Sequence, residues 1–137
     1  MMKIADAMPE AKFDYTSTPA QRNYGEQILH VATVNVRLLP LLQPKTPPPA
    51  INAKATSKGE ILKALADSFD WGTTIITQHT DDTMLQVVQV PDVLRFLGAS
   101  RQARLMYFLI GHTWDIYGQM AVYLRLNGIV PPASLTP

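Results

Sequence analysis

The stretch that decides the fold is residues 100–128, SRQARLMYFLIGHTWDIYGQMAVYLRLNG, the longest uninterrupted helical pattern in the chain. One stripe of positions in it recurs at steps of three and four residues, which is the spacing of one face of an α-helix. The stripe consists of Leu105, Leu109, His112, Ile116, Gln119 and Tyr123. Ser100 can cap this helix at its start, and Gly128 can supply the left-handed residue that ends it. The sequence therefore predicts a long helix over about 100–127.

Two further helices are predicted upstream from capping signals and apolar spacing. Residues 17–21, STPAQ, resemble a helix start, because the threonine can cap, the proline suits the first helical position and the glutamine can close a capping box. This helix is expected to reach about Leu39. Ser57 and Glu60 offer a second capping box, and the apolar residues that follow it at helical spacing predict a helix at about 57–79.

Two long connections separate these three helices. The first, at about 40–56, is rich in proline and is expected to be extended and semi-rigid. The second, at about 80–99, mixes acidic residues, a short apolar run, a proline and a glycine, which fits a connection with one local turn. A two-strand hairpin there would be isolated, so we do not expect one. Long amphipathic helices without strands predict an all-α bundle.

The segment before the first long helix is too short to complete that bundle. Met1 to Met8 make barely two turns of helix. Three long helices would then leave an apolar groove that a fourth helix normally fills. We expect this groove to be covered by a second copy of the chain, as a homodimer, or by residues missing from the sequence.

Composition excludes several classes of protein. The 137 residues fit a single domain, 1–137, and 47% hydrophobic residues are enough for a packed core. Twelve Lys and Arg against eleven Asp and Glu give a net charge of +1 without a basic stripe, so we expect no nucleic-acid partner. No apolar run is long enough to span a bilayer and no signal pattern opens the chain, so we expect no membrane association and a cytoplasmic location, unless a signal peptide was removed from a longer precursor. The absence of cysteine excludes disulfides, thiolate ligands and a cysteine nucleophile.

The three histidines are the most versatile functional side chains. His112 lies within the apolar arc of the last helix and is expected to be buried, where a metal, a carboxylate or a carbonyl could satisfy its ring nitrogens. His30 lies near the middle of its helix at the polar edge, which is typical of a cleft-lining or surface residue. Because mid-helix positions can approach one another in either helix orientation, the two could share a site. His79, at a helix end, is expected to interact with the helix dipole.

Two segments together resemble the DinB/YfiT-like superfamily, namely residues 17–35, STPAQRNYGEQILHVATVN, and residues 112–132, HTWDIYGQMAVYLRLNGIVPP. The resemblance implies a four-helix bundle of up-down-down-up topology, here with a short or incomplete first helix. It also implies a divalent metal held by one histidine of the second helix and a His-x-x-x-His pair of the fourth. His30 matches the first of these ligands and His112 matches the first member of the pair.

The remaining ligand of that pattern is missing here. Ile116 occupies the place of the third histidine and has no lone pair to offer. Asp115, three residues after His112, could turn inward as a substitute, although a solvent-side or second-shell carboxylate is the favoured interpretation because the residue lies at the edge of the apolar arc. Zinc or nickel is therefore expected to bind weakly or not at all.

Two functions from different classes remain open at this point. Relatives of this kind include metal-dependent S-transferases that use a low-molecular-weight thiol, which implies a small-molecule substrate and a thiolate stabilised by the metal. The alternative is a helical-bundle binding or interaction module that has lost the metal, which the isoleucine at position 116 favours. The resemblance supplies no particular substrate.

Overall fold

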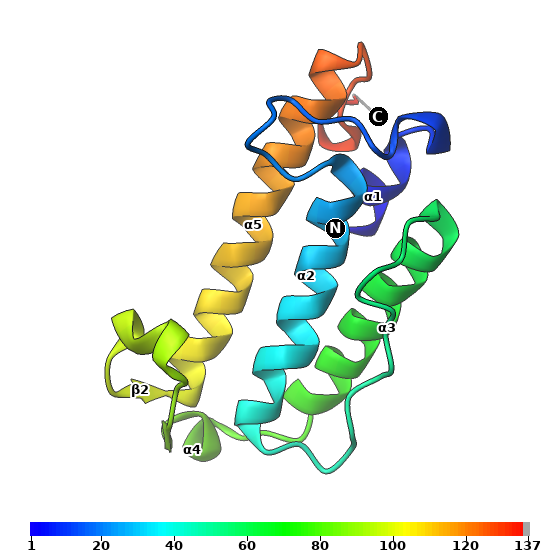
Figure 1. Cartoon of the computed structure of the whole chain (residues 1–137). Helices are drawn as coiled ribbons and strands as arrows, with labels where there is room; N and C mark the ends of the chain where they lie inside the picture. Colours follow the sequence, from blue (N-terminus) through cyan, green and yellow to red (C-terminus); the bar gives the residue numbers. More distant parts are fainter. Residues whose placement is uncertain (136–137) are drawn as a thin grey trace.

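The computed structural model of the chain is an all-α bundle with up-down-down-up topology (Figure 1). The described part covers residues 1–135, so residues 136 and 137, the end of the predicted domain, lie outside it. The bundle helices are α1 (Met2–Ala7), α2 (Tyr24–Leu38), α3 (Lys58–Ile76) and α5 (Gln102–Leu126). In Figure 1, α2 and α3 run in one direction and α5 runs in the other, beside α2. The predicted fold class is confirmed.

The start of α2 differs from the prediction. The helix begins at Tyr24, capped by Asn23, whose side chain accepts from the Glu26 amide at 2.7 Å while the Glu26 carboxylate accepts from the Asn23 amide at 2.8 Å. The threonine and proline of the predicted start lie in a turn before it instead. An amide of the first turn of α2 also has a partner outside the helix, because Gly25 donates to the carbonyl of Phe13 at 2.8 Å. A complete capping box with tertiary support therefore prevails over the local signal at 17–21.

The helix α3 begins close to its predicted start and ends early. Ser57 caps it by accepting from the Glu60 amide at 3.4 Å, as expected. The Glu60 carboxylate accepts from the Ser57 hydroxyl at 2.8 Å instead of from the Ser57 amide, so the predicted capping box is only half formed. Its last residue is Ile76, three residues before the predicted end at position 79. Between α2 and α3 the chain forms a 3-10 turn, η2 (Leu39–Leu42), and then the long crossover that returns it to the other end of the bundle (Figure 1).

The second connection contains more structure than predicted. It holds a short helix α4 (Asp81–Met84), a 3-10 turn η3 (Asp92–Leu97) and the two-residue strands β1 (Val87–Val88) and β2 (Ser100–Arg101). The strands pair antiparallel, so the expectation of no hairpin is wrong. The pair is not isolated, because β2 leads directly into α5 and the intervening turn buries leucines in the core.

The start of α5 differs from the prediction, and its end agrees with it. Ser100 does not cap the helix, because its hydroxyl donates to the carbonyl of Leu97 at 2.9 Å, and α5 begins at Gln102 with no side-chain cap. At the other end Gly128 has φ 73° and donates to the Arg125 carbonyl at 3.0 Å, while Ile129 donates to the Leu124 carbonyl at 2.9 Å. This pair of hydrogen bonds is a Schellman motif, so the predicted glycine stop is confirmed.

The first helix is as short as predicted. The six-residue α1 packs against both α3 and α5 and covers one end of the space between them. It is anchored there by Tyr24, whose hydroxyl donates to the Ile4 carbonyl, and by an ion pair of 2.9 Å between Lys58 and Asp6. Among residues 1–135 no helix is long and apolar enough to cross a membrane.

Candidate functional site

His30 on α2 and His112 on α5 meet across the seam between these helices. Their Nε2 atoms lie 3.1 Å apart, and the ring centroids are 5.0 Å apart at an interplanar angle of 61°. The convergence of two mid-helix histidines, which the sequence left as a possibility, is therefore present. His112 is only partly buried, contrary to the prediction, because it lies at the edge of the α2–α5 contact and not within the core.

A series of polar contacts along the seam fixes the register of α2 against α5. Tyr123 donates from its hydroxyl to the carbonyl of Arg22 at 2.7 Å, and Gln27 Nε2 donates to Gln119 Oε1 at 2.8 Å. The contact between His30 and His112 is the next one along the seam. Residue numbers rise on α2 as they fall on α5, so the helices are antiparallel and their middles coincide. These long-range contacts determine which residues of α2 face His112.

Both histidines are shifted toward the neutral form. Burial first, then the positive charges of Arg22 and His112, lower the pKa of His30 from 6.5 to about 4. Burial also lowers the pKa of His112, opposed by the negative charge of Asp115 and assisted by Arg22. At neutral pH the pair is therefore uncharged, with imidazole lone pairs in the state that metal binding requires.

The pair is not fully satisfied by hydrogen bonding. The Nδ1 atom of His112 is buried and has no hydrogen-bond partner among the described residues. Two neutral rings with Nε2 atoms 3.1 Å apart can form one hydrogen bond, in which one ring donates and the other accepts. A buried ring nitrogen without a partner is costly and marks the pair as a candidate functional site.

A divalent ion fits the donor set, although the set is small. Zinc binds imidazole nitrogen at about 2.0–2.1 Å, so two nitrogens of one tetrahedral ion lie roughly 3.3 Å apart, close to the separation seen here. No group of three or more His, Asp or Glu that could hold a metal occurs within residues 1–135. Ile116 is 3% exposed and packs in the core, where it offers no donor. The exposed Asp115 accepts from Gln119 Nε2 at 3.0 Å.

A hollow of about 340 Å³ opens beside His30. It is lined by Arg22, Glu26, Leu29, His30, Thr33 and Ala53. Arg22 was not singled out from the sequence, which placed it inside the predicted helix. In the structure it lies just before α2, and its carbonyl accepts from the Tyr123 hydroxyl at the seam. The remaining histidine, His79, lies apart, and its Nδ1 is 3.2 Å from the Thr83 hydroxyl in the second connection.

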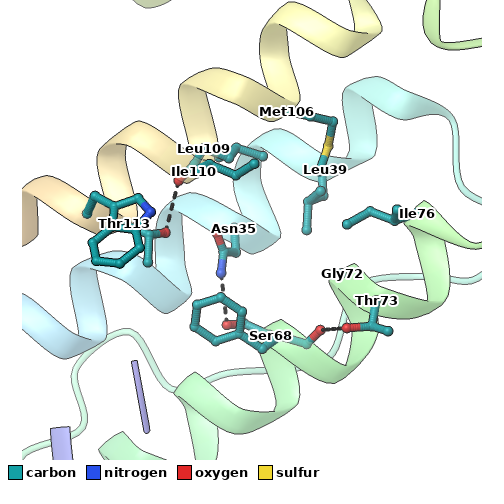
Figure 2. Close-up of a pocket in the computed structure, with 12 residues that line it drawn as sticks. Asn35, Leu39, Ser68, Gly72, Thr73, Ile76, Met106, Leu109, Ile110 and Thr113 are labelled. Carbon is teal, nitrogen blue, oxygen red and sulfur yellow. Dashed lines mark hydrogen bonds between the residues drawn. The ribbon is translucent and has the colours of Figure 1, made fainter. Parts of the chain in front are cut away.

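A second, chemically different region lies on the other side of α5. Figure 2 shows the groove between α3 and α5, with Asn35 and Ser68 hydrogen-bonded at 3.3 Å on its floor. Two hollows of about 190 and 430 Å³ lie along it. Among the described residues no charged side chain lines either hollow, although Met1, with the N-terminal ammonium group, lines the larger one. Ile110 and Trp114 on the rim are 49% and 67% exposed. This is the uncovered groove that the short first helix predicts.

The fold and the histidine pair together define a helical bundle with two convergent histidines in its α2–α5 seam. The model of the DinB superfamily matches residues 1–120, and the chain belongs to this superfamily. A crystal structure of a DinB-like protein from Bacillus cereus ATCC 10987 is similar to this chain, with a TM-score of 0.78, 18% sequence identity, and coverage of 96% of this chain and 85% of that one. That similarity concerns the fold. No curated protein matches the chain.

Proposed function

We propose that this DinB-superfamily protein binds a divalent metal, zinc or nickel, weakly between His30 and His112, and that it acts in the cytoplasm on a small molecule in the manner of a thiol S-transferase. The observation that carries the proposal is the 3.1 Å separation of two Nε2 atoms on different helices. The depressed pKa of His30 supports it, because the imidazole does not have to lose a proton near neutral pH before it can bind a metal.

The chain's own residues supply a site that is open on one side. Two imidazoles leave most of the coordination shell to water or to donor atoms of a ligand, since Ile116 and Asp115 contribute none in this arrangement. A bound divalent ion would stabilise a thiolate and so raise the concentration of the nucleophile at neutral pH. Arg22 places a positive charge on the same hollow, which favours an anionic ligand there.

Isothermal titration with zinc tests the proposal. The natural protein is expected to bind one zinc ion weakly, and His30→Ala and His112→Ala are each expected to abolish the binding heat. His79→Ala is the matched control, because it removes an imidazole that lies apart from the seam. No heat with the natural protein, or equal loss in the control, would contradict the proposal.

A second candidate function, interaction with another copy of the chain, is favoured by the groove. Tyr107, Ile110 and Trp114 form an exposed ridge on α5 at steps of three and four residues, beside an uncharged hollow. In a two-fold dimer each copy contributes the same patch, so the ridge of one copy can cover the groove of the other. The two aromatic side chains alone contribute on the order of 300 Å², against about 800 Å² per copy in a standard interface.

The neutral lining of the hollow beside Ile110, among the described residues, is the argument for a second copy over a charged partner. A lining of neutral side chains offers no ion pair to a basic or acidic segment, and the ridge itself is apolar. Sedimentation equilibrium tests this candidate. A dimer at micromolar concentration is expected, and a monomer at all concentrations up to the millimolar range would contradict it.

A further inference from the structure

The hollow beside His30 continues into a second one on the outer side of α2. The second hollow has a volume of about 390 Å³ and shares three lining residues with the first, namely Glu26, Leu29 and Ala53. The two hollows are therefore contiguous, with the crossover between α2 and α3 forming their common wall. Together they can hold an elongated molecule with one end beside the histidine pair.

The end beside the histidines carries an available positive charge. Arg22 has no carboxylate within ion-pairing distance among residues 1–135. Its backbone carbonyl is held by the Tyr123 hydroxyl at 2.7 Å, which ties its position to α5. Glu26 brings a negative charge to the same hollow, but its carboxylate is held at the start of α2, where it accepts from the Asn23 amide at 2.8 Å. The Thr33 hydroxyl donates to the Leu29 carbonyl at 2.8 Å.

The far end is apolar at its base. Four of its lining residues are buried core side chains, Phe13, Leu29, Ala55 and Ile61. The charged residues of its lining are Asp14, Glu26 and Lys54, a net charge of −1, which disfavours a carboxylate in this chamber and leaves the Arg22 end for the head group. A tail that enters this chamber would meet these side chains at its base and polar groups at its rim, and its binding would gain about 25 cal/mol per Å² of apolar area removed from water.

We infer that these joined hollows bind a small amphipathic carboxylate, with its head group at Arg22 beside His30 and its apolar tail in the chamber formed by Phe13 and Ile61. The inference rests on the proposed function only in placing the head group next to the metal-binding pair. A carboxylate is the natural partner of a guanidinium, because it accepts two parallel hydrogen bonds. The chamber's size suits a tail of several carbons.

Octanoate is the probe, compared with octan-1-ol, which has the same tail without charge, and with acetate, which has the same head without a tail. Binding is followed by amide chemical shifts in NMR, once with one equivalent of zinc and once with a chelator. Octanoate is expected to bind at least tenfold more tightly than either comparison molecule, with shifts at Arg22, Ala53 and Ile61. Equal affinity for octanoate and octan-1-ol would overturn the charge assignment, and equal affinity for octanoate and acetate would overturn the tail chamber.

Two variants separate the head from the tail. Arg22→Gln is expected to weaken octanoate about tenfold and leave octan-1-ol unchanged, with Arg125→Gln at the far end of α5 as its control. Ala53→Phe is expected to block the junction and abolish binding of both ligands, because Ala53 lines both hollows. Ala50→Phe is its control, an exposed alanine of the same crossover that lines neither of them. Octanoate binding unchanged by Arg22→Gln or by Ala53→Phe would overturn the inference.

Failure of the carboxylate site can be distinguished from failure of the proposed metal site. Octanoate binding that depends on Arg22 in the presence of chelator, with no zinc binding by calorimetry, supports this site and contradicts the proposed metal. Zinc binding that depends on His30 and His112, without octanoate binding, does the reverse.

Discussion

The two sides of α5 differ in whether their side chains have partners on a neighbouring helix. Toward α2 the helix presents His112, Gln119 and Tyr123, and each of these meets a partner on or just before α2. Toward the groove it presents Ile110, which is labelled in Figure 2, and Trp114, and these two side chains are 49% and 67% exposed. The short α1 packs against α3 and α5. Because it has only six residues, it covers one end of the groove between them, and it does not lie in the α2–α5 seam. The candidate chemistry and the candidate interface are therefore separable by mutation.

The largest effect is expected from Ile116→His. This substitution adds a third imidazole one turn after His112, and the affinity for zinc should rise by about a hundredfold or more, because a third nitrogen completes the protein ligands of a typical open zinc site. Without metal the variant should lose about 1–3 kcal/mol of unfolding free energy, since a polar ring replaces a packed aliphatic one. Calorimetric titration with zinc and urea denaturation measure the two quantities.

Ile110→His provides the matched control for this prediction. It adds an imidazole to the same helix on the groove side, at a residue that is 49% exposed, and should leave the zinc affinity unchanged. If both variants gained affinity equally, or if the natural protein already bound zinc as tightly as Ile116→His, the ligand set inferred here would be wrong.

A smaller effect is expected from Trp114→Glu on the groove side. A charge placed on the ridge should weaken self-association by at least about tenfold, because it would be desolvated in the interface without a partner. Sedimentation equilibrium measures the change, and Val122→Glu on the same helix is the control, since Val122 is 50% exposed and lines neither hollow. Loss of association in both variants would assign the interface to another surface.

Tyr24→Phe tests whether the packing of α1 can be weakened without affecting the histidine pair. The buried Ile4 carbonyl would lose its side-chain donor, at a cost of about 1–2 kcal/mol in unfolding free energy. Zinc affinity should stay the same, because the hydrogen bond lies outside the seam. Urea denaturation with a parallel zinc titration checks both expectations, and a zinc affinity that fell together with stability would show that the two regions are coupled.

The smallest effect is expected from pH acting on the seam. Because the pKa of His30 is about 4 when folded and 6.5 in the reference state, the unfolded chain binds more protons between these values. Stability should therefore be complete above about pH 6.5 and fall as the pH drops toward 4, by on the order of 1 kcal/mol once partial exposure is allowed for. His30→Asn should flatten this part of the denaturation profile, whereas an unchanged slope would place the titration elsewhere.

The errors of the sequence interpretation have a common cause. Position 18 and Ser100 both looked like helix caps, and at each point a partner from outside the local pattern decided otherwise. The carbonyl of Phe13 takes an amide of the first turn of α2, and the hydroxyl of Ser100 turns to the carbonyl of Leu97. The short hairpin between β1 and β2 was missed for the same reason, since it depends on its attachment to α5. Helix boundaries are decided by competition among hydrogen bonds that the linear pattern does not contain.

The sequence by itself determined that three long helices form, that the last one ends at Gly128, that the first helix is short, and that His30 and His112 are candidates for a site. These features follow from spacing within one helix or from residue chemistry, and both are local. Only the tertiary structure decided that Nε2 of His30 would lie 3.1 Å from that of His112 and that Arg22 would line the hollow beside His30. The contacts responsible join residues 82, 92 and 101 positions apart, and their register follows from how the helices pack against one another.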